Sequence, residues 1–338
     1  ATPESATITN GLFTDTEGRP VHAHGGGILR VGPVYYLYGT TRKESSSAWL
    51  SEGVNCYSSS DLQHWKLEGE VFHNTSISLP SSVGAAGPPW RIERPKVVFN
   101  AATKKFVMWF HLDDVKFSLG YVGVAVADSA TAPFSFVHGF QPDGLRSLDL
   151  TLFQDGVDAG EECTGSDGAH VFLIRSVDNK YAGISMLSDD YLNVSDKGIL
   201  SHAPKCEGQA MFRVRNASTG SCDYVLLGSH LTGWSSNPAI LSVSQGPLGS
   251  GNEWHQQGNP ASSDSTFNSQ SNYILPYKHP STGKLLPIYM GDRWNFHGPG
   301  SVGNASYVWL PMQRVMNPQS GKPMFTMNWA SSWRVADF

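Results

Sequence analysis

The sequence predicts an all-β fold, a five-bladed β-propeller, and three observations lead to it. The 338 residues include 35 glycines and 20 prolines, which favours short strands joined by turns over long helices. Five segments share one layout, in which two apolar runs are followed by a polar or glycine-rich turn and then by a last strand tipped with aromatic residues. This unit of roughly 50 to 60 residues, repeated five times, leaves no remainder for a second domain.

The five expected blades follow one another within a single domain over residues 1–338. Their expected bounds are 20–75, 90–140, 146–200, 205–256 and 266–335. The paired apolar runs are typified by 105–110 and 122–127 in the second blade, and the last strand of the fifth is expected near 325–333. Two stacked β-sandwiches are the alternative, but they do not need the same turn after the same strand in every repeat. The radial arrangement also hides the sheet edges.

Composition excludes several classes of protein. Charged residues make up 16% and the AVILMFWYC set 40%, so the chain has the apolar material for a large core and is not disordered. Lys and Arg total 24 against 29 Asp and Glu, without a long run of either sign, and we expect no nucleic-acid partner. No apolar run approaches the ~20 residues that cross a bilayer, so no membrane partner is expected. We expect a monomer.

Two features predict a secreted, extracellular glycoprotein. Four N-x-Ser/Thr sequons occur beside turn-like residues, at Asn74, Asn193, Asn216 and Asn304, where glycans could lie on the surface. The N-terminal residues 1–4 carry no basic and apolar leader, as expected after removal of a signal peptide.

The four cysteines suggest one disulfide. Cys206 and Cys222 flank a predicted hairpin, so we expect them to pair across adjacent strands. The pairing of Cys56 and Cys163 stays open, with buried thiols as the alternative.

Polar residues stand directly before the apolar core of each expected innermost strand. They are His22 and His24, Glu93 and Arg94, Asp149, Glu207, and Asn268 with Gln270. Innermost strands surround the axis of a propeller, so these side chains should meet in one pocket. A cluster of carboxylates there would raise the pKa of at least one of them by repulsion and desolvation, which is typical of glycosidases. His22 and His24 lack a third metal ligand at a defined spacing, and we expect neither a metal nor a cofactor.

Several segments together resemble glycoside hydrolase family 43, and within it the exo-β-1,3-galactanase branch. They are residues 22–29 with 35–39, 92–97, 146–153, 207–212, 231–238, 268–270, and 291–294 with 307–311. The resemblance covers nearly the whole chain and is specific as a set. It implies a five-bladed propeller that hydrolyses its substrate with inversion. The implied partner is a polysaccharide, β-1,3-galactan or arabinogalactan, from whose non-reducing end galactose is released.

The resemblance also implies roles for individual residues. Glu207 would be the general acid, and Asp149 would orient it and hold up its pKa. Glu93 and Arg94 would hydrogen-bond the hydroxyls of the sugar. An inverting enzyme needs a base across the ring, and the Asp that usually serves is missing from the first blade. In this branch Gln270 is its substitute, in an imidic tautomer or as a residue that positions water, with His24 and then Glu93 as alternatives.

Other residues expected to contact the sugar are His24, Phe117, Asn179, Thr232, Trp234 and Trp294. Phe117 stands where the family has a tyrosine, and the stretch 156–167 lengthens the third repeat; both differences bear on sugar preference. A galactofuranosidase or arabinofuranosidase with the same mechanism is therefore an alternative. A carbohydrate-binding propeller without activity is another, because the usual base is missing.

Overall fold

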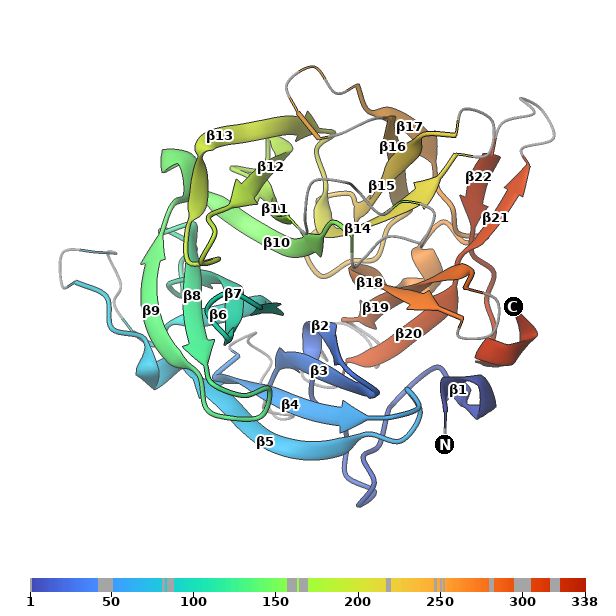
Figure 1. The fold of residues 1–338 in the computed structure, drawn as a ribbon, viewed down its shortest axis with the longest axis horizontal. Helices are drawn as coiled ribbons and strands as arrows, with labels where there is room; N and C mark the ends of the chain where they lie inside the picture. Colours follow the sequence, from blue (N-terminus) through green and yellow to red (C-terminus); the bar gives the residue numbers. More distant parts are fainter. Residues whose placement is uncertain are drawn as a thin grey trace.

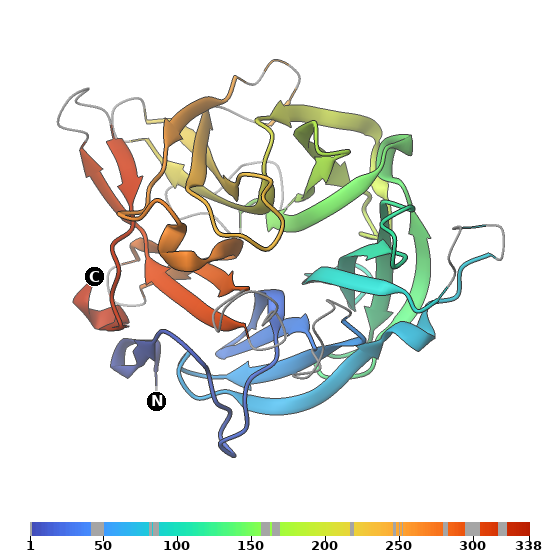
Figure 2. The ribbon, with the colours of Figure 1, turned by 180° about the vertical axis from the view of Figure 1, so that it is seen from behind.

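The structure, a computed structural model, describes residues 2–41, 51–80, 83, 88–156, 163, 170–216, 220–245, 248–249, 251, 253–279, 283–294, 305–316 and 323–338. Within these ranges the regular structure consists of β-strands and short 3₁₀ turns. Five sheets stand around a common axis, as Figure 1 shows from one side and Figure 2 from the other. The prediction of an all-β, five-bladed propeller is confirmed.

Each blade is an antiparallel meander whose strands follow the chain outward from the axis. Blade 1 contains β2 (His24–Val31), β3 (Val34–Thr40), β4 (Gly53–Ser59) and β5 (Lys66–His73). Blade 2 contains β6 (Arg91–Asn100), β7 (Lys105–Asp113), β8 (Tyr121–Ala127) and β9 (Ser135–Phe140). Blade 3 contains β10 (Ser147–Gln154), β11 (Val171–Val177), β12 (Tyr181–Leu187) and β13 (Val194–Ala203). Blade 4 contains β14 (Glu207–Arg215), β15 (Cys222–Ser229), β16 (Ala239–Gln245) and β17 (His255–Gly258).

Blade 5 is closed differently from the prediction. Its described strands are β18 (Gln270–Lys278), β19 (Leu285–Arg293) and β20 (Ser306–Pro311). The outer side of β20 pairs with the N-terminal segment, because Gly11 and Tyr307 exchange backbone hydrogen bonds of 2.9 and 2.8 Å. The expected last strand near 325–333 contributes β23 (Ser332–Arg334) instead to a separate pair with β1 (Thr7–Thr9). Both ends of the chain therefore close the ring, and the termini lie beside blade 5 in Figures 1 and 2.

The remaining short elements lie outside the blades. They are the hairpin of β21 (Gln313–Met316) and β22 (Pro323–Thr326), and the 3₁₀ turns η1 (Pro3–Ser5), η2 (Asn74–Ser76), η3 (Pro142–Gly144), η5 (Thr266–Asn268) and η7 (Val335–Asp337).

Four large hydrophobic clusters fill the spaces between neighbouring blades. One joins blades 4, 5 and 1, and the others lie between blades 1 and 2, 2 and 3, and 3 and 4. In the first cluster Trp65 and Trp309 are buried edge to face, with ring centroids 5.8 Å apart. Alternating apolar side chains on each strand thus pack one blade against the next, which fixes the innermost strands around the axis.

Every innermost strand carries a β-bulge near its start. The register with the next strand shifts at residues 24–27, 93–96, 147–150, 207–210 and 271–273. A bulge bends the strand and re-aims its side chains. Gly25 and Gly208 adopt φ of 62° and 57° at the same place in blades 1 and 4, where Arg94 adopts 54° in blade 2. The left-handed conformation costs a non-glycine residue about 1–2 kcal/mol, so surrounding contacts must hold Arg94 in it.

The disulfide joins Cys163 to Cys222, and the predicted Cys206–Cys222 pair is wrong. Cys222 pairs in the sheet with Arg215, whereas Cys206 precedes Glu207 at the other end of the same hairpin. The two ends of a nine-residue strand are too far apart for a disulfide. Cys56 and Cys206 are buried thiols. The bond therefore ties blade 4 to Cys163, which lies in the chain between β10 and β11 of blade 3.

We predict that this disulfide contributes about 4 kcal/mol to the free energy of unfolding, because it closes a loop of 59 residues. Urea unfolding with and without reductant measures the contribution. The Cys222→Ser variant serves as the control, since reductant should leave its stability unchanged. Equal stability of the oxidised and reduced wild type would contradict the prediction.

The sequons differ in accessibility. Asn193 is exposed, but the side-chain nitrogens of Asn74 and Asn216 donate buried hydrogen bonds to the Trp90 carbonyl and to Asp223, at 3.1 and 2.9 Å. A glycan would have to replace these bonds, so surface glycosylation of Asn74 and Asn216 does not fit the structure. Asn304 lies outside the described residues.

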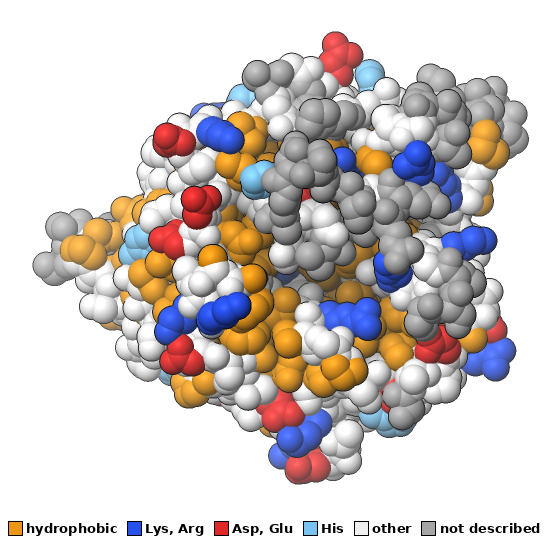
Figure 3. Space-filling model, in the orientation of Figure 1, with side chains coloured by type: hydrophobic (Ala, Val, Ile, Leu, Met, Phe, Trp, Pro, Cys, Tyr) orange, Lys and Arg blue, Asp and Glu red, His pale blue; other side chains and the backbone are white. Residues whose placement is uncertain are grey.

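The surface carries both signs of charge. On the face seen in Figure 3, acidic and basic side chains are scattered, and hydrophobic side chains surround a hollow near the middle. Across the described ranges, no helix has the length and hydropathy required to span a membrane.

Candidate active site

A cavity of about 620 Å³ lies where the five innermost strands begin. Most of the residues predicted to meet at the axis or to contact the sugar line it, namely Glu93, Arg94, Phe117, Asp149, Asn179, Glu207, Trp234, Gln270 and Trp294. The bulges explain the convergence, because they turn the first side chains of β6, β10, β14 and β18 toward one another.

His24 and Thr232 do not line this cavity. The predicted sugar contact of His24 is corrected, whereas that of Thr232, an exposed residue next to Gly233 and Trp234 of the lining, stays a prediction. The His24 ring is 1% exposed, lies 3.0 Å from Asp292 through Nδ1, and stacks on Tyr307 with centroids 5.0 Å apart. A ring buried in this way cannot reach the substrate, which also removes His24 as the base. The Thr232 hydroxyl donates to the Ser235 carbonyl and so shapes the loop that presents Trp234.

Arg94 links neighbouring parts of the cavity wall through both terminal nitrogens of its guanidinium group. One nitrogen donates to Gln270 Oε1 at 2.6 Å and lies 2.8 Å from Asp149 Oδ2. The other donates to the Ser271 carbonyl at 2.9 Å and to the side-chain oxygen of Asn272. Arg94 is 6% exposed, so this cation is buried with a carboxylate and three further acceptors. These contacts hold its left-handed backbone in place and join blade 2 to blades 3 and 5.

Asp149 and Glu207 form an asymmetric pair of carboxyl groups. Burial alone would raise the pKa of Asp149, but the Arg94 cation, the hydrogen bond from Gly208 N at 2.9 Å and the nearby His111 hold it below its ordinary value. Burial, and then the charge of Asp149, raise the pKa of Glu207 to about 7. One carboxyl group thus stays ionised while its neighbour keeps a proton near neutral pH.

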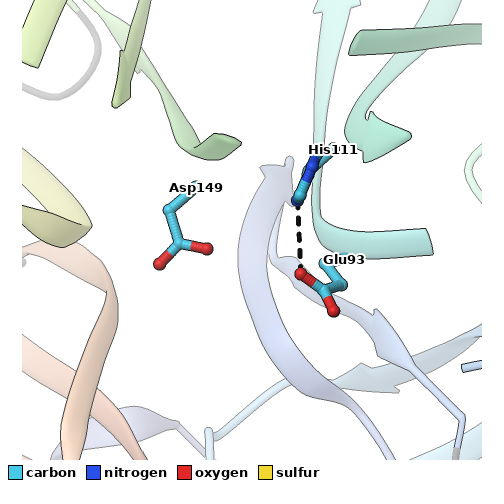
Figure 4. Close-up of side chains that lie close together, drawn as sticks. All are labelled: Glu93, His111 and Asp149. Carbon is cyan, nitrogen blue, oxygen red and sulfur yellow. Dashed lines mark hydrogen bonds and ion pairs between the residues drawn. The ribbon is translucent and has the colours of Figure 1, made fainter. Parts of the chain in front are cut away.

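The carboxyl group of Glu93 is hydrogen-bonded to a buried histidine, His111. His111 lies on β7 between two carboxylates, with Nδ1 3.2 Å from Glu93 Oε2 and Nε2 3.1 Å from Asp113 Oδ2. Burial would lower the pKa of His111, but these two carboxylates raise it to about 9. The ring is therefore an imidazolium at neutral pH that donates from both nitrogens. Figure 4 shows His111 joined to Glu93, with the carboxyl group of Asp149 to one side of them.

The same three side chains could be read as a metal site. One donor atom from each of Glu93, His111 and Asp149 lies within 4.8 Å of the other two. Both ring nitrogens of His111 are already paired with carboxylates, Nδ1 with Glu93 and Nε2 with Asp113, and Asp149 is paired with Arg94. The chemistry of this set fits hydrogen bonding better than metal binding.

Aromatic rings form the other walls. Trp294 is buried, and its Nε1 donates to Gln270 Oε1 at 2.7 Å. Trp234 meets it edge to face with centroids 5.4 Å apart and is 37% exposed at the mouth. Phe117 also lines the cavity, and the Arg91 guanidinium lies over its ring, 4.4 Å from the centroid. Such faces are suited to the apolar face of a sugar.

Several residues behind or beside the cavity wall were missed by reasoning from the sequence. His111 sits within an apolar strand, where a histidine is easily read as core. Asp292 is fully buried and accepts from His24, from Gly25 N at 2.7 Å and from Asn272. A signal for it existed, because an aspartate in the interior of a strand requires partners. Arg91, Arg146 and Asp178 also line the cavity.

Comparisons with known proteins match this geometry. No family model matches the chain, and no curated protein does. Among solved structures, a GH43 β-1,3-galactosidase in complex with galactodeoxynojirimycin is 30% identical, with a TM-score of 0.79 over 97% of this chain and 100% of that one. An exo-β-1,3-galactanase from Phanerochaete chrysosporium, bound to β-1,3-galactotriose, is 30% identical, with a TM-score of 0.76 over 98% of this chain and 68% of that one. An exo-β-1,3-galactanase from Clostridium thermocellum is 29% identical, with a TM-score of 0.76 over 96% and 66%.

A propeller of this form, with paired carboxyl groups of opposite protonation in a solvent-facing axial cavity, defines a glycoside hydrolase. The chain belongs to glycoside hydrolase family 43.

Proposed function

We propose that this protein is a secreted, inverting exo-β-1,3-galactanase that releases galactose from the non-reducing ends of β-1,3-galactan chains. The observation that carries the proposal is the pairing of Glu207, whose pKa is raised to about 7, with ionised Asp149 inside the cavity. The solved relatives supply the sugar, since their descriptions name β-1,3-galactanase activity and β-1,3-galactotriose as a bound ligand.

In the proposed reaction the terminal galactose occupies the cavity, with Glu93 and Arg94 at its hydroxyls. Glu207 gives its proton to the glycosidic oxygen as the bond from that oxygen to the anomeric carbon breaks. A water molecule adds to the opposite face of the anomeric carbon and loses one proton to the protein. The products are α-galactose and a chain shortened by one unit. Trp234, exposed at the mouth, is placed to stack against the next sugar.

Product analysis tests the proposal. Wild-type protein is incubated separately with β-1,3-galactan, arabinan and an aryl β-galactofuranoside, and the released sugars are identified. Galactose from the first substrate alone is expected. Product from arabinan or the furanoside alone would favour the related furanosidase activities, and no product from any would favour a binding protein.

The pH profile of the reaction should follow Glu207. The acid acts only while protonated, so kcat/KM should fall as the pH rises through about 7. Asp149→Asn removes the negative charge that contributes to this raised pKa while keeping an oxygen that can accept from Arg94 and Gly208. We predict that the alkaline limb of kcat/KM moves about one pH unit toward acid in this variant. An unmoved limb, or one at higher pH, would contradict the pairing.

The extracellular location belongs to the same proposal. The Cys163–Cys222 disulfide and the exposed sequon at Asn193 support it, because disulfides persist in oxidising compartments.

A further inference from the structure

The side chain of Gln270 forms three hydrogen bonds, and in each of them the donor and the acceptor can be identified. Its Oε1 accepts from Arg94 at 2.6 Å and from Trp294 Nε1 at 2.7 Å. Its Nε2 donates to Ser229 Oγ at 2.9 Å, and Ser229 Oγ donates in turn to the Glu207 carbonyl at 3.4 Å. Gln270 is 8% exposed and lines the cavity. It therefore contacts the Arg94 guanidinium and the Trp294 indole directly, and it reaches the strand that carries Glu207 through Ser229 on β15.

The two donors on Oε1 determine which atom of the side chain this is. A guanidinium and an indole N–H only donate, and neither has a lone pair to offer. The atom between them must accept twice, so it is the carbonyl oxygen, and a flipped amide would set its own hydrogens against theirs.

The same donors oppose the imidic tautomer. In that form Oε1 carries a hydrogen, so one of its two hydrogen bonds must break, and the bond to Arg94 is assisted by charge. The tautomer would also break the hydrogen bond that fixes Trp294 or Arg94 in the cavity wall while the sugar is bound. A neutral amide without this change is a very weak base.

We infer that Gln270 works in the amide form, as a positioning residue that holds Arg94 and Trp294 against the sugar, and does not take the proton of the attacking water. The inference rests on the proposed glycosidase function of the site. The proton must then go to an ionised carboxylate of the same cavity. Glu93 is suited to this, because His111 holds Oε2, while Oε1 lies 3.6 Å from the Arg91 guanidinium and accepts no hydrogen bond.

Azide rescue separates positioning from base catalysis. We expect Gln270→Ala to lower kcat/KM about 100-fold, the size of effect caused by misplacing a bound substrate. Azide attacks the anomeric carbon without losing a proton. It can therefore restore activity that was lost with a general base, but not activity that was lost because Arg94 and Trp294 are misplaced. Azide should therefore change the rate of the variant less than about twofold. A tenfold or greater recovery with formation of galactosyl azide would overturn the inference.

Trp294→Phe supplies a second readout, because it keeps an aromatic ring and removes one donor from Oε1. If Gln270 positions, this variant loses activity, and combining it with Gln270→Ala costs much less than the product of the two separate losses. If Gln270 were the base, freeing its oxygen would ease the tautomer and the activity of Trp294→Phe would be kept or raised.

A spectroscopic measurement decides the matter without turnover. In protein labelled with ¹⁵N in glutamine side chains, the Gln270 signal, assigned by its loss in Gln270→Glu, should show two protons on Nε2 with and without galactose. One proton on that nitrogen would overturn the inference. Absence of wild-type activity on every glycoside would count against the proposed function and leave this measurement to judge Gln270. Thermal melting confirms that each variant is folded.

Discussion

Replacing Glu207 with glutamine is expected to lower kcat on β-1,3-galactan about 10³-fold or more while galactan still binds. The variant keeps the size and burial of the side chain but removes the proton donor, and a positioned general acid contributes about 10²- to 10⁴-fold. Steady-state kinetics and calorimetric titration with β-1,3-galactotriose measure the two effects. Turnover near the wild-type rate would refute the role of Glu207 as acid.

Substrates with different leaving groups distinguish loss of the general acid from general damage to the site. An aryl galactoside whose phenol is strongly acidic departs without protonation, so Glu207→Gln should slow its hydrolysis far less than that of galactan. Equal losses on both substrates would indicate a damaged site instead of a missing acid. Glu253→Gln is the matched control, since that side chain is 84% exposed on blade 4 and its change should affect neither substrate.

Replacing Arg94 with methionine is expected to cost both stability and activity. The change leaves Asp149 buried without its cation and removes the donors to Gln270, Ser271 and Asn272. Breaking a buried ion pair from one side costs about 3–5 kcal/mol, and kcat/KM should fall at least 10²-fold because the sugar loses a contact and the wall loses its support. Urea unfolding and steady-state kinetics measure the two losses.

Two control variants test why Arg94→Met should lose stability and activity. Arg94→Lys keeps the charge but not the planar fork, so it should recover part of the stability and little of the activity. Arg334→Met breaks a surface pair with Asp337 in which the two side chains are 61% and 45% exposed, and it should cost less than about 1 kcal/mol. An Arg94→Met variant as stable as Arg334→Met would show that the buried network does not hold the site together.

Local sequence patterns were sufficient to predict the fold and most of the residues that line the cavity. Alternating apolar runs predicted the strands, and the polar residues before each innermost strand predicted that Glu93, Asp149, Glu207 and Gln270 would meet, because a propeller brings equivalent positions to its axis. The resemblance to family 43 then supplied roles that residue types alone do not distinguish.

What the sequence could not supply depends on long-range geometry. Cys163 reaches Cys222 from another blade, and the N-terminal segment completes blade 5 from the opposite end of the chain. Neither pairing leaves a local pattern. His24 was expected at the sugar because it opens an innermost strand, but Asp292 of the neighbouring blade draws its ring away from the cavity.

The protonation of Gln270 and Glu207 is likewise a property of neighbours and not of spacing. Trp294 and Arg94 come from different blades, yet both donate to one amide oxygen. Asp149 acts on Glu207 across the boundary between blades 3 and 4. Such effects become visible only once the ring is closed.

A crystal structure of Glu207→Gln with β-1,3-galactobiose tests the central claim most directly. The account predicts the terminal galactose inside the axial cavity, its hydroxyls within hydrogen-bond distance of Glu93 and Arg94, and the linking oxygen at the side chain of residue 207. A disaccharide bound elsewhere, or one whose linking oxygen lies beyond reach of residue 207, would contradict it.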